Sequence, residues 1–478
     1  MESEALPRLR GDLEILSGQP DATLIYDPVQ RTLFELHPED LPLVKLLDGK
    51  HSLPEIARGL RRPLAEVQEL VDDLSDAFLL EDPEQEEMLR ALRRRNREED
   101  RLLAPVLDNG PLPDPSVPPI HVVDDARHTC LRCGACCHYA VPVSPEERTR
   151  LEAVDWPAGT VPEESGGLFQ LRPGLQWGRL EETIATRSDP TRCVFLDENN
   201  LCQVHQRLGE TAKPFVCRLF PLAFPVLVPE GILFSLTFEC PFIYATYDTG
   251  EPFAVRPELL RALAAEMEEI YILPSEIDLW EGKKVAREPF LQWEEQLRGR
   301  LVAPATRPEA FLETLTHAWG ELDAHEVSPS PTPEAFGHMA QALREAALSE
   351  QPLLSETPEG TEGSRQAGIV LEALKERPLR AWEPVPWEDG PEADRFLVRF
   401  AHHFLGGKQY LLYRTAWLGL RALAAIVLLS RCDASFLARQ AGRERVGVEM
   451  LNRAVARWCR LLDLRPIRLA YVRAALQG

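Results

Sequence analysis

The stretch Cys130-Leu-Arg-Cys133-Gly-Ala-Cys136-Cys137 places four thiols within eight positions of a chain that has 10 cysteines in 478 residues. A two-residue spacing lets successive thiolates face a common centre, while the backbone amides between them can donate to sulfur. Gly134 permits the tight turn that this arrangement requires. The stretch therefore predicts a loop that binds a metal.

Four further cysteines extend this pattern along the chain. The three cysteines spaced by two residues match the start of a bacterial ferredoxin-type run, whose remaining ligand can come from elsewhere. Cys240, which Pro241 follows, is a candidate for that ligand. Residues 193–202 predict a hairpin that turns on Asp-Glu-Asn-Asn and brings its two cysteines side by side. The second set consists of Cys193, Cys202 and Cys217, which Cys137 is free to join.

The kind of metal stays open, because zinc and iron–sulfur centres both accept four thiolates. An iron–sulfur centre would be of the 4Fe–4S type, since the spacing is that of a ferredoxin. His205, which lies close to Cys202, is an alternative ligand in a Cys₃His zinc site. Cys432 and Cys459 are expected to be buried apolar side chains. The predicted metal ligands are Cys130, Cys133, Cys136, Cys137, Cys193, Cys202, Cys217 and Cys240.

The composition and charge of the chain indicate its cellular compartment, and the compartment decides whether clustered thiols are read as metal ligands or as disulfides. Hydrophobic residues make up 44% and charged residues 27%, as in soluble globular proteins. The formal net charge of −23 argues against nucleic acid or an anionic membrane surface as the main partner. No signal peptide is visible, and the apolar segment 416–429 is too short to cross a membrane. We expect a cytoplasmic protein, in which clustered thiols favour metal binding over disulfides.

The chain is too long for one ordinary core, so we predict a multidomain protein of the α+β class. A small winged-helix-like domain with a charged helix comes first, and a proline-rich linker follows it. A loop-rich metal module and a mostly α-helical C-terminal region complete the chain. The predicted boundaries are 1–103, 104–119, 120–275 and 276–478.

The first domain contains several strong local signals. Residues 23–36 predict a β-hairpin around an Asp-Pro turn. Ser52 is expected to cap a helix through Leu60, with Glu55 in the capping-box position. This part of the chain resembles the PqqD-like peptide-recognition domains. The resemblance is in the phrase Leu46-Leu47-Asp48-Gly49-Lys50-His51-Ser52-Leu53-Pro54-Glu55-Ile56. The resemblance covers roughly residues 20–85 and implies a protein or peptide substrate bound beside the sheet edge. A winged helix that only packs against the rest of the chain is the alternative.

The cysteine pattern as a whole resembles the YkgJ-type (CxxCxxCC) family. The resemblance implies a zinc- or iron-chelating domain in which each of the eight cysteines has a counterpart. One departure is Lys213-Pro214, where the family usually shows Arg-Pro. The phrases that carry the resemblance are Cys130-x-x-Cys133-Gly-Ala-Cys136-Cys137, Cys193-Val-Phe-Leu, Cys202-x-x-His205, Lys213-Pro-x-x-Cys217-Arg-Leu-Phe-Pro221 and Cys240.

The YkgJ-type family is similar to the flagellin lysine N-methylases, which share the cysteine module and a helical C-terminal part. Residues 396–412 and 417–429 resemble that part loosely. The likeness implies a protein- or peptide-modifying enzyme that transfers methyl groups to lysine, with S-adenosylmethionine as cofactor. No Gly-rich nucleotide loop follows a strand. The pair His402-His403 is a candidate for acid–base chemistry or for a structural role.

Two functions of other classes stay open beside the enzyme. A non-enzymatic module that binds protein or peptide could use zinc to organise its loops. An iron–sulfur electron carrier is a further alternative. If the chain is an enzyme, it is expected to be a lysine N-methylase-like transferase or an iron–sulfur oxidoreductase.

Overall fold

The computed structural model describes residues 6–17, 23–114, 118–138, 141–157, 159–161, 167–173, 180–188, 191–280, 282–301, 305–322, 385–463 and 465–477. The chain divides into two compact units. Unit 1 comprises Met1–Arg101 with Phe169–Thr183, and unit 2 comprises Leu102–Leu168 with Ile184–Gly478. Helices and small sheets occur together, with helices in the C-terminal part, as predicted for the α+β class. Residues 323–384 of the predicted helical region lie outside the described residues.

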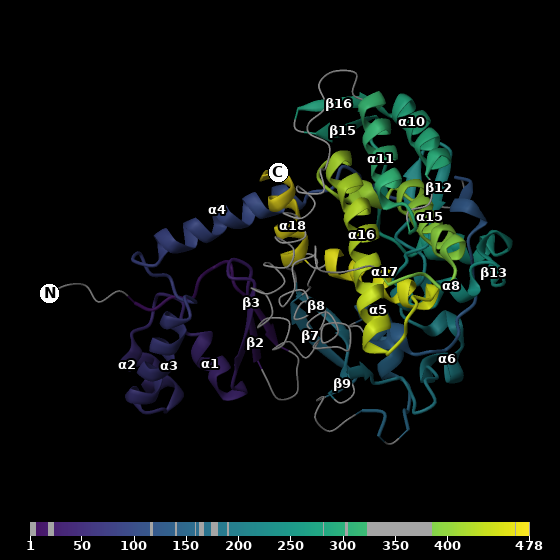
Figure 1. The fold of residues 1–478 in the computed structure, drawn as a ribbon. Helices are drawn as coiled ribbons and strands as arrows, with labels where there is room; N and C mark the ends of the chain where they lie inside the picture. Colours follow the sequence, from purple (N-terminus) through teal and green to yellow (C-terminus); the bar gives the residue numbers. More distant parts are fainter. Residues whose placement is uncertain are drawn as a thin grey trace. The chain divides into compact units, whose positions relative to one another are not determined.

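Unit 1 contains a three-stranded antiparallel sheet followed in sequence by helices (Figure 1). Strands β2 and β3 form the predicted hairpin, in which Asp27 pairs with Thr32. Residues 169–183 contribute most of a second, two-stranded sheet. The elements are β1 (Glu14–Ser17), β2 (Thr23–Asp27), β3 (Thr32–Leu36), η1 (Pro38–Asp40), α1 (Leu41–Val44), α2 (Leu53–Leu60), α3 (Leu64–Asp76), α4 (Glu86–Leu103), β7 (Phe169–Pro173) and β8 (Leu180–Ile184).

Local chemistry explains the turns of unit 1. Ser52 and Glu55 form the predicted capping box at the start of α2, and the Ser52 N–H donates to Glu55 Oε2 at 2.8 Å. At the hairpin turn, the buried Asp27 carboxylate accepts from the Val29 N–H at 2.8 Å and pairs with Arg10 at 2.7 Å. The buried charge of Asp27 is therefore both paired and hydrogen-bonded, as burial requires.

Unit 2 contains a five-stranded sheet with the strand order β4-β14-β11-β12-β5. Its strands are β4 (Asp108–Pro111), β5 (Ile120–Val122), β11 (Val226–Val228), β12 (Gly231–Phe234) and β14 (Glu269–Ile272). Strand β4 lies inside the segment 104–119 that the sequence predicted as a linker. Its residues disfavour strands, but β4 is an edge strand, where proline is tolerated. The domain boundaries themselves stay predictions.

The cysteine loops of unit 2 run between short helices and strands. Each of these elements has fewer than ten residues, as is typical of a loop-rich module. They are η2 (Val123–Asp125), β6 (Arg127–His128), η3 (Ala135–His138), α5 (Pro145–Glu152), β9 (Thr186–Ser188), β10 (Thr191–Cys193), α6 (Gln203–Leu208), η5 (Glu210–Ala212), α7 (Phe215–Leu219), α8 (Ile243–Thr246), β13 (Glu251–Pro252), η6 (Phe253–Val255), α9 (Pro257–Ala265), β15 (Glu276–Trp280) and β16 (Lys283–Ala286).

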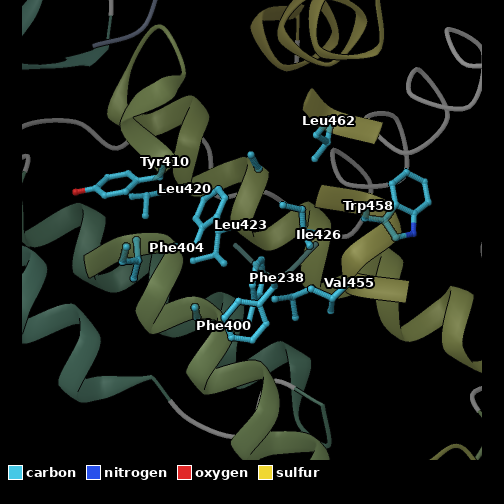
Figure 2. Close-up of a cluster of buried hydrophobic side chains, with 14 of the residues drawn as sticks. Phe238, Phe400, Phe404, Tyr410, Leu420, Leu423, Ile426, Val455, Trp458 and Leu462 are labelled. Atoms are coloured by element: carbon cyan, nitrogen blue, oxygen red, sulfur yellow. The ribbon is translucent and has the colours of Figure 1, made fainter. Parts of the chain in front are cut away.

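The C-terminal helices contribute much of the core of unit 2, and Figure 2 shows Phe238 of the cysteine module among their apolar side chains. Helix α16 is mostly buried, as predicted for a core helix over residues 416–429. In the part of the chain that the structure describes, no helix is long and apolar enough to span a membrane. The helices are α10 (Arg287–Arg300), α11 (Pro308–Leu322), α15 (Gly390–Gly406), η8 (Gln409–Leu412), α16 (Ala416–Gln440), α17 (Val448–Asp463) and α18 (Arg465–Gln477).

Candidate metal centre

The first cysteine loop folds tightly around Gly134. Gly134 has φ +72°, in the left-handed region that favours glycine, and its carbonyl accepts from the Cys137 N–H at 2.9 Å. A Cβ at this position would lie 3.1 Å from atoms of Leu196 and of Asn200. The predicted turn is therefore present, and its glycine lets the first cysteine loop pack closely against the second.

The second cysteine loop turns at Asp197. Asp197 Oδ1 accepts from the N–H groups of Asn199 and Leu201, both at 2.8 Å, so one carboxylate fixes the turn. Leu196 and Cys202 form an antiparallel bridge across this turn. Cys202 is consequently an electrostatic neighbour of Cys193, as expected for the predicted hairpin.

The eight thiols are electrostatic neighbours in two overlapping groups that share Cys136. Cys240 has Cys130, Cys133 and Cys136 as neighbours, and we call these four residues the Cys130 set. Cys217 has Cys193, Cys136 and Cys202 as neighbours, and Cys137 has Cys136, Cys193 and Cys217. The Cys137 set consists of Cys137, Cys193, Cys202 and Cys217. The two sets meet where the thiols of Cys136 and Cys137 share a hydrogen bond.

Backbone amides donate to several of these sulfur atoms in a repeated pattern. The Arg132 N–H donates to Cys130 Sγ at 3.4 Å. The same relation, from the amide two residues further on, joins Ala135 to Cys133 and Phe242 to Cys240. Cys193 receives the corresponding bond from Phe195. An N–H donor favours the thiolate over the thiol, and the thiolate is the form that binds metals.

Positive side chains lie near the thiols as well. Arg460 and Lys213 favour the ionised form of Cys136, and Arg187 does the same for Cys193. Burial acts in the opposite direction and raises the pKa of Cys193 and of Cys240 to about 12. Metal binding to these thiols must therefore displace protons.

The donor atoms of these residues are of the kind that binds a metal through thiolates. All ten cysteines are free of disulfides. Eight soft sulfur donors, amide hydrogen bonds to sulfur and nearby cations suit zinc or an iron–sulfur cluster. Within the described residues, no group of three or more His, Cys, Asp or Glu side chains is arranged to hold an ion.

The other sequence candidates lie on helices. His205 is exposed on α6, and its role as a ligand stays a prediction. Cys432 is on α16 and Cys459 on α17. Burial raises the pKa of Cys432 to about 11 and also raises that of Cys459. Neither residue has one of the eight clustered cysteines among its main charged neighbours.

The paired histidines on α15 have structural partners. His402 Nδ1 lies 2.9 Å from Asp124 Oδ2, and His402 Nε2 lies 3.0 Å from the Arg298 carbonyl oxygen. The fully buried His403 accepts from the Leu236 N–H through Nδ1 at 3.2 Å, and its Nε2 lies 3.1 Å from Tyr247 Oη. Every ring nitrogen of the pair is thus engaged within the protein, which favours the structural role.

Two residues near the Cys130 set escaped the sequence analysis. Asn452 and Arg460, both on α17, contact the segment around Cys240. The Asn452–Cys240 bond joins residues 212 positions apart. The apolar periodicity of α17 predicts a helix but gives no sign of such a contact.

Comparison with protein families gives a match to part of the chain. Residues 129–274 match the model of the CxxCxxCC family, which is described as a "putative zinc- or iron-chelating domain". Comparisons with curated proteins and with solved structures found no match. The match spans all eight clustered cysteines, and it supports zinc or iron chelation by this segment of the chain.

Proposed function

We propose that the eight cysteines bind zinc or iron at two adjoining centres, one formed by the Cys130 set and one by the Cys137 set. The observation that carries the proposal is the gathering of all eight thiols, with Cys130, Cys133 and Cys136 around Cys240, and Cys193 and Cys202 beside Cys217. Bound zinc would stabilise the loops around it, and an iron–sulfur cluster would add the capacity to transfer an electron. The proposal assumes the cytoplasmic location that the sequence predicts.

Metal and sulfide analysis of protein purified without oxygen tests the proposal. We expect either about two zinc ions per chain in a colourless protein or iron with acid-labile sulfide in a brown one. Cys133→Ser and Cys217→Ser should each remove about half of the metal, because each substitution affects one set. Cys432→Ser is the control and should leave the metal content unchanged. Full metal content in both ligand variants would contradict the ligand assignment.

We further propose that the metal module serves a protein- or peptide-modifying reaction, with methyl transfer to lysine as the leading example. This step rests on the resemblance to the flagellin lysine N-methylases and the PqqD-like domains. The outer strands β1 and β3 of the unit 1 sheet support it, since an extended peptide can add a strand to such an edge. S-adenosylmethionine would be the methyl donor by the resemblance alone.

An assay with isotopically labelled S-adenosylmethionine and lysine-containing peptides tests the reaction. The metal-loaded protein should transfer label to lysine, and the Cys133→Ser and Cys217→Ser proteins should not. Metal binding without transfer would favour the binding module or, if the centre is reversibly reduced, the electron carrier. Either result would leave the proposal of metal binding intact.

A further inference from the structure

Helix α17 holds the loop that contains Cys240. Asn452 is fully buried on this helix. Its Nδ2 donates to the Cys240 carbonyl at 3.0 Å, and its Oδ1 accepts from the Tyr244 N–H at 3.1 Å. One amide side chain therefore ties together both ends of the turn that leads from Cys240 into α8. These bonds satisfy buried backbone groups, whose exposure to an apolar core would be costly.

Arg460 reaches the same loop from two turns further along α17. Its guanidinium donates to the Glu239 carbonyl, and its Nε lies 3.8 Å from the Glu239 carboxylate. Cys136 and Cys133 also favour its protonated form. Only 21% of the Arg460 side chain is exposed. A cation that is so little exposed to solvent requires negative charge nearby.

The Glu239 carboxylate supplies part of that negative charge, and a thiolate-bound metal would add to it. Four thiolates around one zinc ion, or around one 4Fe–4S cluster, leave a net negative charge on the centre. Arg460 has Cys133 and Cys136 of the Cys130 set as charged neighbours, whereas Lys213 is a charged neighbour of Cys217 as well as of Cys136. The positive charge of Arg460 on α17 therefore acts on thiols of the Cys130 set.

The packing around the loop is consistent with a fixed relation between α17 and Cys240. Phe238, two residues before Cys240, is buried among the helices, with its ring 5.4 Å from that of Phe400. Figure 2 shows Phe238 beside Phe400 of α15 and Val455 of α17. The loop therefore starts from a rigid core position, and the Asn452 and Arg460 contacts fix its course from there.

We propose that helix α17 completes the centre of the Cys130 set: Asn452 positions the Cys240 loop, and Arg460 provides the counter-charge for the thiolates of Cys133 and Cys136. The proposal rests on the proposed metal binding. The two positioning residues lie outside the segment 129–274 that matches the family model. That segment by itself would therefore form the centre of the Cys130 set poorly.

Chelator competition with variants of α17 tests this proposal. Arg460→Met removes the charge and keeps a long side chain, and Asn452→Leu removes both hydrogen bonds at similar size. We expect each to weaken one centre by about 10- to 100-fold, so that half of the metal is lost first. Arg460→Lys keeps the charge and should restore most of the affinity, which a purely packing role would not predict.

Combined variants identify which centre is affected. Arg460→Met added to Cys217→Ser should remove nearly all metal, because the two substitutions affect different sets. Arg460→Met added to Cys133→Ser should remove no more than Cys133→Ser alone. In an iron–sulfur protein, Arg460→Met should also lower the reduction potential, since a nearby cation favours the reduced cluster.

Arg457→Met is the matched control for loss of stability. Arg457 lies on the same helix and is buried, but it pairs with Asp433 of α16 at 3.0 Å. Its loss should reduce stability and leave metal affinity near that of the unmodified protein. Equal metal loss from Arg457→Met, or unchanged affinity in Arg460→Met and Asn452→Leu, would overturn the role of α17. Unmodified protein without metal would instead overturn the proposed function itself.

Discussion

His403 is a buried imidazole whose surroundings keep it neutral. Burial lowers its pKa to about 3, against 6.5 for an ordinary histidine. The nearby Asp124 raises this pKa, and Arg298, Arg399 and His402 lower it. The unfolded chain therefore binds a proton between about pH 6.5 and pH 3 that the folded chain does not. The contribution of His403 is full above this window and is lost as the pH falls through it.

The low pKa of His403 makes a large contribution to the pH dependence of stability. A difference of this size in pKa corresponds to roughly 4 to 5 kcal/mol of unfolding free energy across the whole window. His403→Asn keeps an acceptor for the Leu236 N–H but removes the titrating ring. We expect the variant to be about 2 kcal/mol less stable at pH 7.5 and to lose less stability between pH 6.5 and 4.5. Urea unfolding at several pH values measures the slope; an unchanged slope would assign the proton to another group.

At the scale of elements, helix α16 packs closely against η8 at Gly419. A Cβ at Gly419 would lie 1.9 Å from the Tyr410 carbonyl oxygen, a distance that backbone atoms cannot tolerate. Gly→Ala inside a helix ordinarily adds about 1 kcal/mol of stability. Gly419→Ala should instead cost about 1 to 3 kcal/mol, because the two elements must separate.

Thermal unfolding of matched variants tests the Gly419 contact. Gly299 of α10 is the control, since a Cβ there would meet no atom within 4 Å. Gly299→Ala should keep or raise the unfolding temperature by the ordinary helix preference. Similar behaviour of the two variants would show that α16 can shift away from η8 at little cost.

At the scale of the whole molecule, the sequence predicted what local chemistry determines. The capping box of α2 and the Gly134 turn depend on neighbours within a few positions, and both are present. The edge strand β4 was missed, because its residues Asp108–Pro111 have low strand propensity and only pairing with β14 orders them. The contact of Asn452 with Cys240 depends on how distant elements pack, which no local pattern encodes.

The two units have separate hydrophobic cores, and this separation predicts how metal removal will act. The core of unit 1 includes Ile25 and Val67, whereas Cys240 belongs to the core of unit 2. A metal that binds the folded state adds stability in proportion to the logarithm of its concentration over Kd. Stripping the metal should therefore loosen the cysteine loops of unit 2 and leave unit 1 unchanged.

Hydrogen exchange read by mass spectrometry can resolve these regions. Peptides over residues 130–137, 193–202 and 236–246 should exchange faster after chelation, because a bound metal would cross-link the thiolates of these loops. Peptides over β2 and β3 in unit 1 are the internal control and should keep their protection. Faster exchange throughout α16 would mean that the metal supports the whole core of unit 2. Because Phe238 is already held by α15 and α17, we expect the loosening to stop at that residue.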